Sequence, residues 1–292
     1  MPFLEGWKDV QNPGSKSILF SHTEGKGLGY SQGYSSLDLF LAQPVCDSQL
    51  IPFVDLRGHV FNHGRFATNA GLGLRWLNSC DNRVWGINFF YDSLLSARRP
   101  YHQVSFGLET LGETWDLRVN GYLPIGRKKT PIYTLDYDFS SGFLAKAREQ
   151  FAMGGIDVEL GRRFCKMQYF DLYAALGPYF YFGRSQKTEN AFRATRKDAI
   201  GGRLRASAAF LTYFELEGVA SYDSRFNWTG QATLSLNIPF DWICFWNQAK
   251  ICAPDRVKEK LFQPVKRNEI IVVDRIQRSS SNPAILDPEF EP

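Results

Sequence analysis

The histidines are the first residues to consider for chemistry, because an imidazole can bind a metal ion or act as a base near neutral pH. The chain has 292 residues and four histidines: His22, His59, His63 and His102. On a strand, His59 and His63 would point the same way but lie about 13 Å apart. That distance is too large for one metal ion, and no third ligand is evident beside them. We expect no metal site.

Nucleophilic catalysis has one candidate, His102 with Ser105, the only Ser/His pair that suits a hydrolase. A loop histidine beside an inward-facing strand serine is the simpler interpretation. Gly27 and Gly29 form part of a Gly-Lys-Gly-Leu-Gly run. No helix follows this run to receive a phosphate, so these glycines belong to a strand or turn. The sequence therefore predicts a protein that is not an enzyme, with no catalytic residue and no cofactor.

A larger group of candidate residues is charged. These residues recur at alternate positions on one face of their segments, where Arg is common and Lys is nearly missing. Arg paired with carboxylates suits a crowded, partly dry interior. The candidates for such an interior are Asp55, Arg57, Arg75, Glu109, Asp116, Arg118, Arg203, Arg205, Glu215 and Glu217.

Strands position these charges. Between Phe66 and Pro124 four consecutive segments alternate apolar and polar side chains, which is typical of antiparallel strands with one apolar and one polar face. Most predicted strands have 8–12 residues, close to the ~9–11 that a tilted strand needs to cross a bilayer. Twelve strands are predicted, at residues 25–31, 35–42, 50–61, 66–77, 83–92, 101–111, 114–124, 153–163, 171–182, 199–210, 213–223 and 229–240.

The apolar face bears on whether these strands surround a core or face lipid. It carries no charged residue in the cores of the twelve strands, and an Arg or Lys at a bilayer midplane would cost about 2–4 kcal/mol. We therefore expect Leu72, Leu74, Ile87, Phe89 and Leu117 to face lipid. From the fifth strand onward long and short connections alternate, as in outer-membrane barrels. A soluble two-sheet β-sandwich that buries the same face stays an alternative.

The sequence argues against a nucleic-acid-binding protein and against an α-helical membrane protein. The net charge of +4 is small and evenly spread, which argues against a nucleic-acid partner. No run approaches the ~18 apolar residues of a spanning helix. The first 24 residues contain charges and no apolar stretch of the kind found in a secretory signal.

Three motifs point to a known family. They are Asn-Ala-Gly-Leu-Gly-Leu-Arg at 69–75 with Val-Trp-Gly-Ile-Asn-Phe-Phe-Tyr-Asp at 84–92, Asn-Gly-Tyr-Leu-Pro at 120–124, and Pro-Val-Lys-Arg-Asn-Glu-Ile-Ile-Val-Val at 264–273. In this order and spacing the chain resembles the inverse autotransporter β-domain of the intimin/invasin family. The resemblance implies a twelve-stranded outer-membrane barrel whose C-terminal linker threads the pore and carries an adhesin passenger. It also implies contact with outer-membrane lipid, the barrel-assembly machinery and periplasmic chaperones.

The chain departs from the family in having no adhesive repeats after residue 240, so adhesion is not carried over. The expected function is a non-catalytic barrel in the cell outer membrane that anchors or exports a C-terminal segment. One alternative is a structural or pore-forming outer-membrane protein without a passenger. Another is a soluble β-rich binding protein.

Four regions are predicted: a periplasmic arm at 1–24, the barrel at 25–240, a linker at 241–278 and a disordered tail at 279–292. Within the linker, Pro254 and Asp255 suit the start of a short helix at 254–262. An extended stretch at 268–275 follows. This order matches the pore segment that the resemblance implies.

The five cysteines are expected to gather at the periplasmic end of the barrel, where disulfides persist. An even strand count places the first and last strand ends there, together with every second connection. We expect the pairs Cys46–Cys80 and Cys244–Cys252, which leaves Cys165 for another chain. Five unpaired thiols are the alternative.

Overall fold

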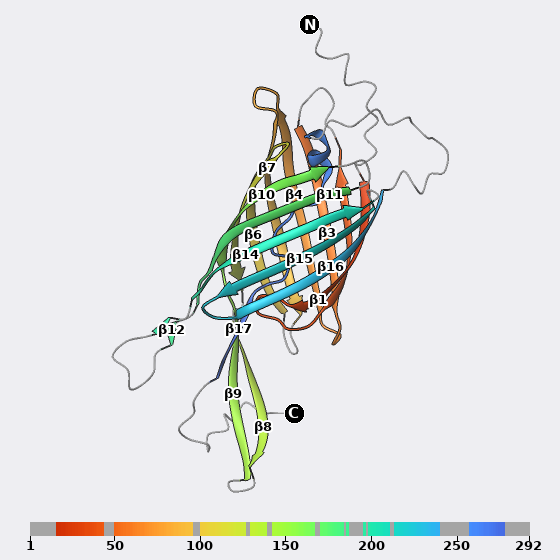
Figure 1. Cartoon of the computed structure of the whole chain (residues 1–292). Helices are drawn as coiled ribbons and strands as arrows, with labels where there is room; N and C mark the ends of the chain where they lie inside the picture. Colours follow the sequence, from red (N-terminus) through yellow and green to blue (C-terminus); the bar gives the residue numbers. More distant parts are fainter. Residues whose placement is uncertain are drawn as a thin grey trace, which may run out of the picture.

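Twelve antiparallel strands close into a barrel in the computed structural model (Figure 1). The structure describes residues 16–43, 50–95, 100–126, 129–138, 142–166, 170–183, 185–186, 195–196, 198–210, 213–239 and 257–277. The barrel strands are β1 (Lys16–Lys26), β2 (Tyr34–Ala42), β3 (Leu50–Phe61), β4 (Phe66–Asn78), β5 (Arg83–Leu95), β6 (Pro100–Leu111), β7 (Trp115–Ile125), β10 (Gly155–Lys166), β11 (Phe170–Tyr181), β14 (Ala199–Phe210), β15 (Phe214–Asp223) and β16 (Asn227–Pro239). The predicted all-β barrel is confirmed.

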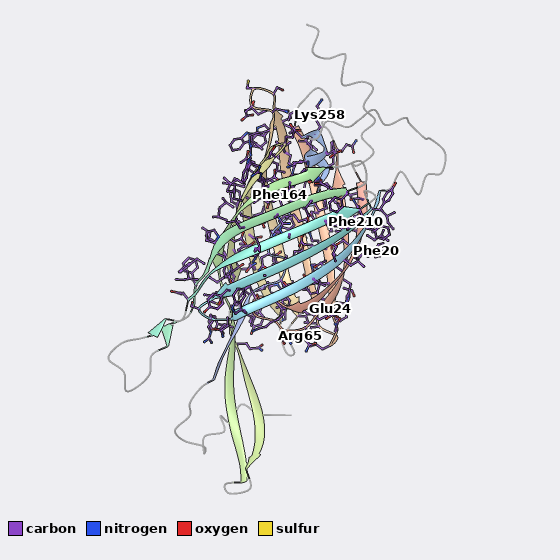
Figure 2. The ribbon with its side chains drawn as sticks, viewed as in Figure 1. Phe20, Glu24, Arg65, Phe164, Phe210 and Lys258 are labelled. Carbon is purple, nitrogen blue, oxygen red and sulfur yellow. The ribbon has the colours of Figure 1, made fainter. Side chains whose placement is uncertain are left out.

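Alternate side chains point into and out of the barrel, as a pleated strand requires. Along β4 every second residue from Ala67 to Arg75 is buried while those between are exposed. The five residues predicted to face lipid lie on the outside, with Leu72 62% exposed. Figure 2 shows the outer wall with Phe20, Phe164 and Phe210, all exposed.

The first strand was predicted too late in the chain. β1 begins at Lys16 and pairs with β16 from Ser17↔Pro239 to Lys26↔Gly230, which closes the barrel. Residues 27–33 form the turn into β2, although 25–31 was predicted as a strand. The boundary between arm and barrel at residue 24 is therefore wrong. Residues 1–15 and 278–292, which include most of the predicted arm and the tail, lie outside the described residues.

The barrel has two mouths. β1 begins and β16 ends at the N-terminal mouth, together with the β4–β5, β6–β7 and β10–β11 connections. The hairpin mouth carries the longer connections. One contains the hairpin β8 (Lys129–Asp138) and β9 (Gly142–Ala152), which extends away from the barrel in Figure 1. Another contains the short pair β12 (Ser185–Gln186) and β13 (Thr195–Arg196).

Residues 257–277 form the linker segment, which passes through the barrel (Figure 1). It starts at the N-terminal mouth with the 3-10 helix η3 (Lys258–Phe262) and ends at the hairpin mouth in β17 (Val273–Gln277). β17 adds to the outer hairpin in a sheet of order β17-β9-β8. The predicted helix at 254–262 is thus a shorter 3-10 turn within the described residues. The predicted extended stretch becomes a strand only from Val273 onward.

No described helix is both long and apolar enough to cross a membrane.

Candidate functional site: the barrel interior and its linker segment

At the N-terminal mouth the linker segment packs into an apolar cluster. Leu261 and Phe262 of η3 are buried, and so is Val265 just after it. The barrel side chains in the same cluster come from the neighbouring strands β2 to β6: Phe40, Ala42, Ile51, Phe53, Leu77, Val84, Phe90 and Leu111. Because these residues belong to β2 to β6, the 3-10 turn packs against this side of the barrel interior.

Arg75 joins this cluster to the charged middle of the barrel. Its Nε donates to Glu109 Oε1 at 2.6 Å, and its Nη1 donates to the Leu261 carbonyl at 3.2 Å and to the Gln263 carbonyl. The guanidinium also lies 4.8 Å from the centre of the Phe53 ring. One interior arginine therefore satisfies two linker carbonyls that have no ladder partner.

A second set of contacts holds the next part of the linker segment. Arg267 forms two bonds with the Asp92 carboxylate, Nη1 to Oδ1 at 2.8 Å and Nη2 to Oδ2 at 2.5 Å. Arg57 donates to Asp55 Oδ2 at 2.6 Å and also pairs with Glu269 of the linker segment. Such two-point guanidinium contacts fix orientation as well as charge. Breaking one side of a buried pair typically costs about 3–5 kcal/mol.

The opposite wall carries a chain of ion pairs. Lys266 Nζ lies 3.0 Å from Glu217 Oε2 and 3.4 Å from Glu215 Oε2. Glu217 also pairs with Arg205 at 3.2 Å, and Arg205 contacts Glu159. Nearer the N-terminal mouth, Lys260 Nζ donates to Asp116 Oδ1 at 2.5 Å. The linker's cations thus lie on barrel carboxylates from more than one side.

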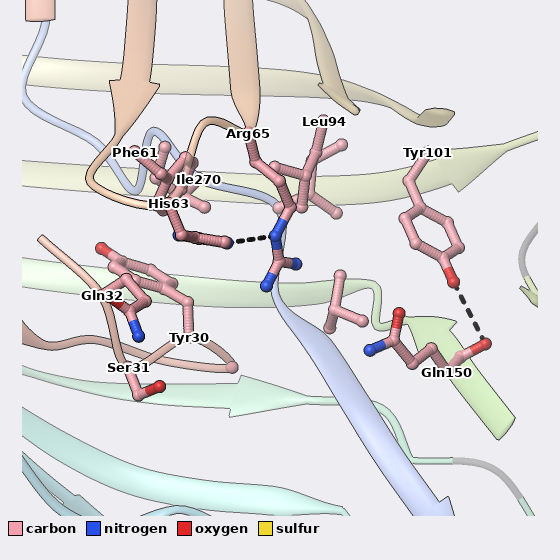
Figure 3. A pocket seen from close by; sticks show the side chains of 13 residues that line it. Tyr30, Ser31, Gln32, Phe61, His63, Arg65, Leu94, Tyr101, Gln150 and Ile270 are labelled. Atoms are coloured by element: carbon pink, nitrogen blue, oxygen red, sulfur yellow. Dashed lines mark hydrogen bonds between the residues drawn. The ribbon is translucent and has the colours of Figure 1, made fainter. Parts of the chain in front are cut away.

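At the hairpin mouth the linker segment enters a second apolar layer. Ile270, Ile271 and Val273 pack with buried side chains that include Tyr34, Phe61 and Tyr101, while Val272 packs with Tyr179 and Tyr181. Arg65 and His63 lie at the edge of a small cavity in this layer (Figure 3). The interior therefore has two apolar layers with a charged layer between them.

Glycine permits the closest approach between linker and barrel. Gly29, in the β1–β2 turn, has φ +81°, and a Cβ added there would lie 2.6 Å from the Val273 nitrogen. The Met153 amide donates to the Val272 carbonyl at 2.9 Å beside it. The linker backbone is therefore held from two sides where it leaves the barrel.

A family model for the inverse autotransporter beta-domain matches residues 29–269. The chain belongs to this family. The match covers nearly all of the barrel and most of the linker segment, and the predicted resemblance is confirmed. No curated protein matches the sequence.

One solved structure supports the barrel fold of this inverse autotransporter domain. A structure from work on the mechanism of in-meso crystallization of membrane proteins is similar to this chain, with a TM-score of 0.60 and 15% identity. The match covers 89% of this chain and all of that one. An outer membrane channel from Pseudomonas putida F1 has a TM-score of 0.46 and 15% identity, over 76% of this chain and 94% of that one. The protein is an outer-membrane β-barrel of the anchor and translocator type.

The ten predicted interior charges lie on inward-facing positions of the inverse autotransporter barrel. Seven are buried: Asp55, Arg57, Arg75, Glu109, Asp116, Arg118 and Arg205. Arg203, Glu215 and Glu217 are half-buried. Asp92 and Glu159, which lie on the same inward face, pair with Arg267 and Arg205, and the sequence analysis assigned no role to the linker charges. The signal was present in the linker, where basic and acidic side chains follow one another from Lys266 to Glu269.

The structure describes two of the five cysteines, Cys80 and Cys165. Cys80 lies exposed in the β4–β5 turn at the N-terminal mouth, and the Cys46–Cys80 bond stays a prediction because residue 46 lies outside the described residues. Cys46, Cys244 and Cys252 lie outside the described residues, so the Cys244–Cys252 pair stays a prediction. Cys165 belongs to the end of β10 at the same mouth.

The histidines have structural partners. His59 is buried between Ser36 and Asn69, each at 2.6 Å. Ser105 points inward and His102 bonds Tyr91, so they form no pair. His22 instead contacts Ser35 at 2.9 Å and Glu24 at 3.0 Å near the hairpin mouth, and thereby links β1 to β2. No described group of three or more His, Cys, Asp or Glu is arranged to hold a metal ion.

Proposed function

We propose that the linker segment closes the pore and anchors the chain that follows it to the outer membrane. The N-terminal mouth faces the periplasm in this proposal, and the hairpin mouth faces the outside. The observation that carries it is the continuous set of buried linker contacts, from Leu261 at one mouth to Val273 at the other. The barrel is then a passive, non-catalytic holder of an extended polypeptide.

Single-channel conductance in planar bilayers tests this proposal. Deleting residues 257–277 should open a stable pore, because both apolar layers and the ionic contacts between them are lost. Deleting residues 278–292 instead should leave the conductance at the level of the intact protein. Heat-modifiable migration on gels verifies that each variant has folded. A folded 257–277 deletion with unchanged conductance would contradict the proposal.

Assembly partners are also proposed from family membership. A barrel that inserts into the outer membrane needs the barrel-assembly machinery, and its passage through the periplasm needs chaperones. Depletion of the assembly machinery should reduce the heat-modifiable form. Its persistence at normal levels would contradict this part of the proposal.

A further inference from the structure

The outer hairpin β8–β9 has one strand edge that is only partly used. β9 has 11 residues, and β17 pairs with five of them, from Val273↔Ala152 to Gln277↔Arg148. β8 pairs with the opposite edge of β9 along the full hairpin, from Lys129↔Phe151 to Asp138↔Gly142. Residues 142–147 of β9 have no second partner among the described residues. An unpaired strand edge is a surface for strand addition.

The direction of the linker fits this edge. The linker segment runs outward through the barrel, whereas β9 runs back toward it, so their pairing is antiparallel. The Met153 amide bonds the Val272 carbonyl at the hairpin mouth. The linker and β9 therefore share one fixed register from Val273 to Gln277, and this register leads toward the unpaired residues of β9.

The hairpin favours this edge over its other one. Strand amides alternate between edges, so the direction of the Met153 amide places the amides of Ala145 and Ala147 on the β17 side. The same alternation turns the odd-numbered amide positions of β8 away from β9, and Pro131 occupies one of them. A proline has no N–H group to offer a new strand. The outer edge of β8 thus lacks one backbone donor for a new strand, while the edge of β9 beside β17 keeps its amide donors.

We propose that β9 is a template that captures the exported chain, one residue pair at a time, as it emerges from the pore. Its proposed occupant in this chain is the segment 278–283, because the register of β17, continued past Gln277, would bring residue 278 opposite Ala147 and residue 283 opposite Gly142. Pairing is available only to residues that have left the pore. It therefore opposes backward sliding and gives export a direction. This inference rests on the proposed function, because it needs a linker that traverses the barrel.

Residue pairing is tested by cross-linking in a variant whose native cysteines are replaced by serine. Ser280→Cys with Ala145→Cys is in register and should form a disulfide within one chain on mild oxidation. Ser280→Cys with Leu135→Cys is the matched control, because Leu135 lies opposite Ala145 on β8. Failure of the first pair, equal bonding of both, or bonding only between two chains would overturn the proposal.

Directional capture is tested by the rate at which an epitope appended after Pro292 reaches the cell surface. Ala145→Pro removes an amide from the template edge and should slow exposure about two- to tenfold. Leu135→Pro, at the same level of the outer β8 edge, should leave the rate unchanged. Equal rates for Ala145→Pro and the native chain would overturn the template. The conductance test stands apart, since it depends on the linker inside the barrel alone.

Discussion

Gly29 shows how a single residue governs the exit of the linker segment. Its positive φ and the 2.6 Å approach of the Val273 nitrogen leave no room for a β-carbon. Gly64 provides a natural comparison, because it has φ +82° in the β3–β4 turn but no atom within 4 Å of an added Cβ. Backbone strain for an alanine at either site is about 1–2 kcal/mol.

We predict that Gly29→Ala weakens the contact between the linker segment and the barrel at the hairpin mouth, and that Gly64→Ala leaves this contact unchanged. Both variants carry the same backbone strain, so their difference isolates the contact with Val273. In planar bilayers Gly29→Ala should show more frequent pore openings than the native protein. Gly64→Ala should match the native protein. Indistinguishable traces for the two variants would show that the linker does not depend on this contact.

The interior charges were predictable one by one, but their partners were not. Period-two alternation places Arg57 and Arg75 on the inward face of their strands regardless of the rest of the fold. Their contacts with Glu269 and Gln263 join residues about 190–210 positions apart, and these contacts exist only once the barrel has closed around the linker. No local pattern determines such pairing.

Among the elements, strands with a continuous apolar face were predicted best. The ranges 50–61 and 199–210 coincide with β3 and β14. β1 was missed because its inward face mixes Leu19 with Ser17, Ser21 and Thr23, while its outward face mixes Phe20 with His22. The hairpin β8–β9 was treated as a long connection, although Tyr133, Leu135 and Tyr137 alternate with polar residues along β8.

The outer face of β4 allows a test of membrane depth. Leu72 lies in the middle of this strand, and Phe66 begins it at the hairpin mouth on the same face. Leu72→Arg should lower the free energy of unfolding by about 2–4 kcal/mol, and Phe66→Arg by about 0–1 kcal/mol, because the cost of a lipid-facing charge falls toward the interface. Chemical unfolding from lipid vesicles measures both. Equal losses would show that Leu72 is not near the bilayer midplane.

For the whole molecule, the orientation in the membrane decides what the linker does. The N-terminal mouth gathers the strand ends Lys16 and Pro239 with the short turns, and the hairpin mouth carries the long connections. Long loops on the outer side are the rule for outer-membrane barrels. In this orientation a chain that follows Gln277 lies outside the cell. The reverse orientation would direct it into the periplasm, where an anchor for a surface segment has no use.

Cys80 reports on this orientation directly, because it is exposed in the β4–β5 turn of the N-terminal mouth. A membrane-impermeant maleimide should leave Cys80 unlabelled in intact cells and label it once the outer membrane is made permeable. A variant with Ser31→Cys in a cysteine-free background provides the outer control, since Ser31 is exposed in the β1–β2 turn at the hairpin mouth. It should react in intact cells. Labelling of Cys80 in intact cells would show that the barrel has the reverse orientation. The linker segment could then still close the pore, but the chain that follows it would lie in the periplasm.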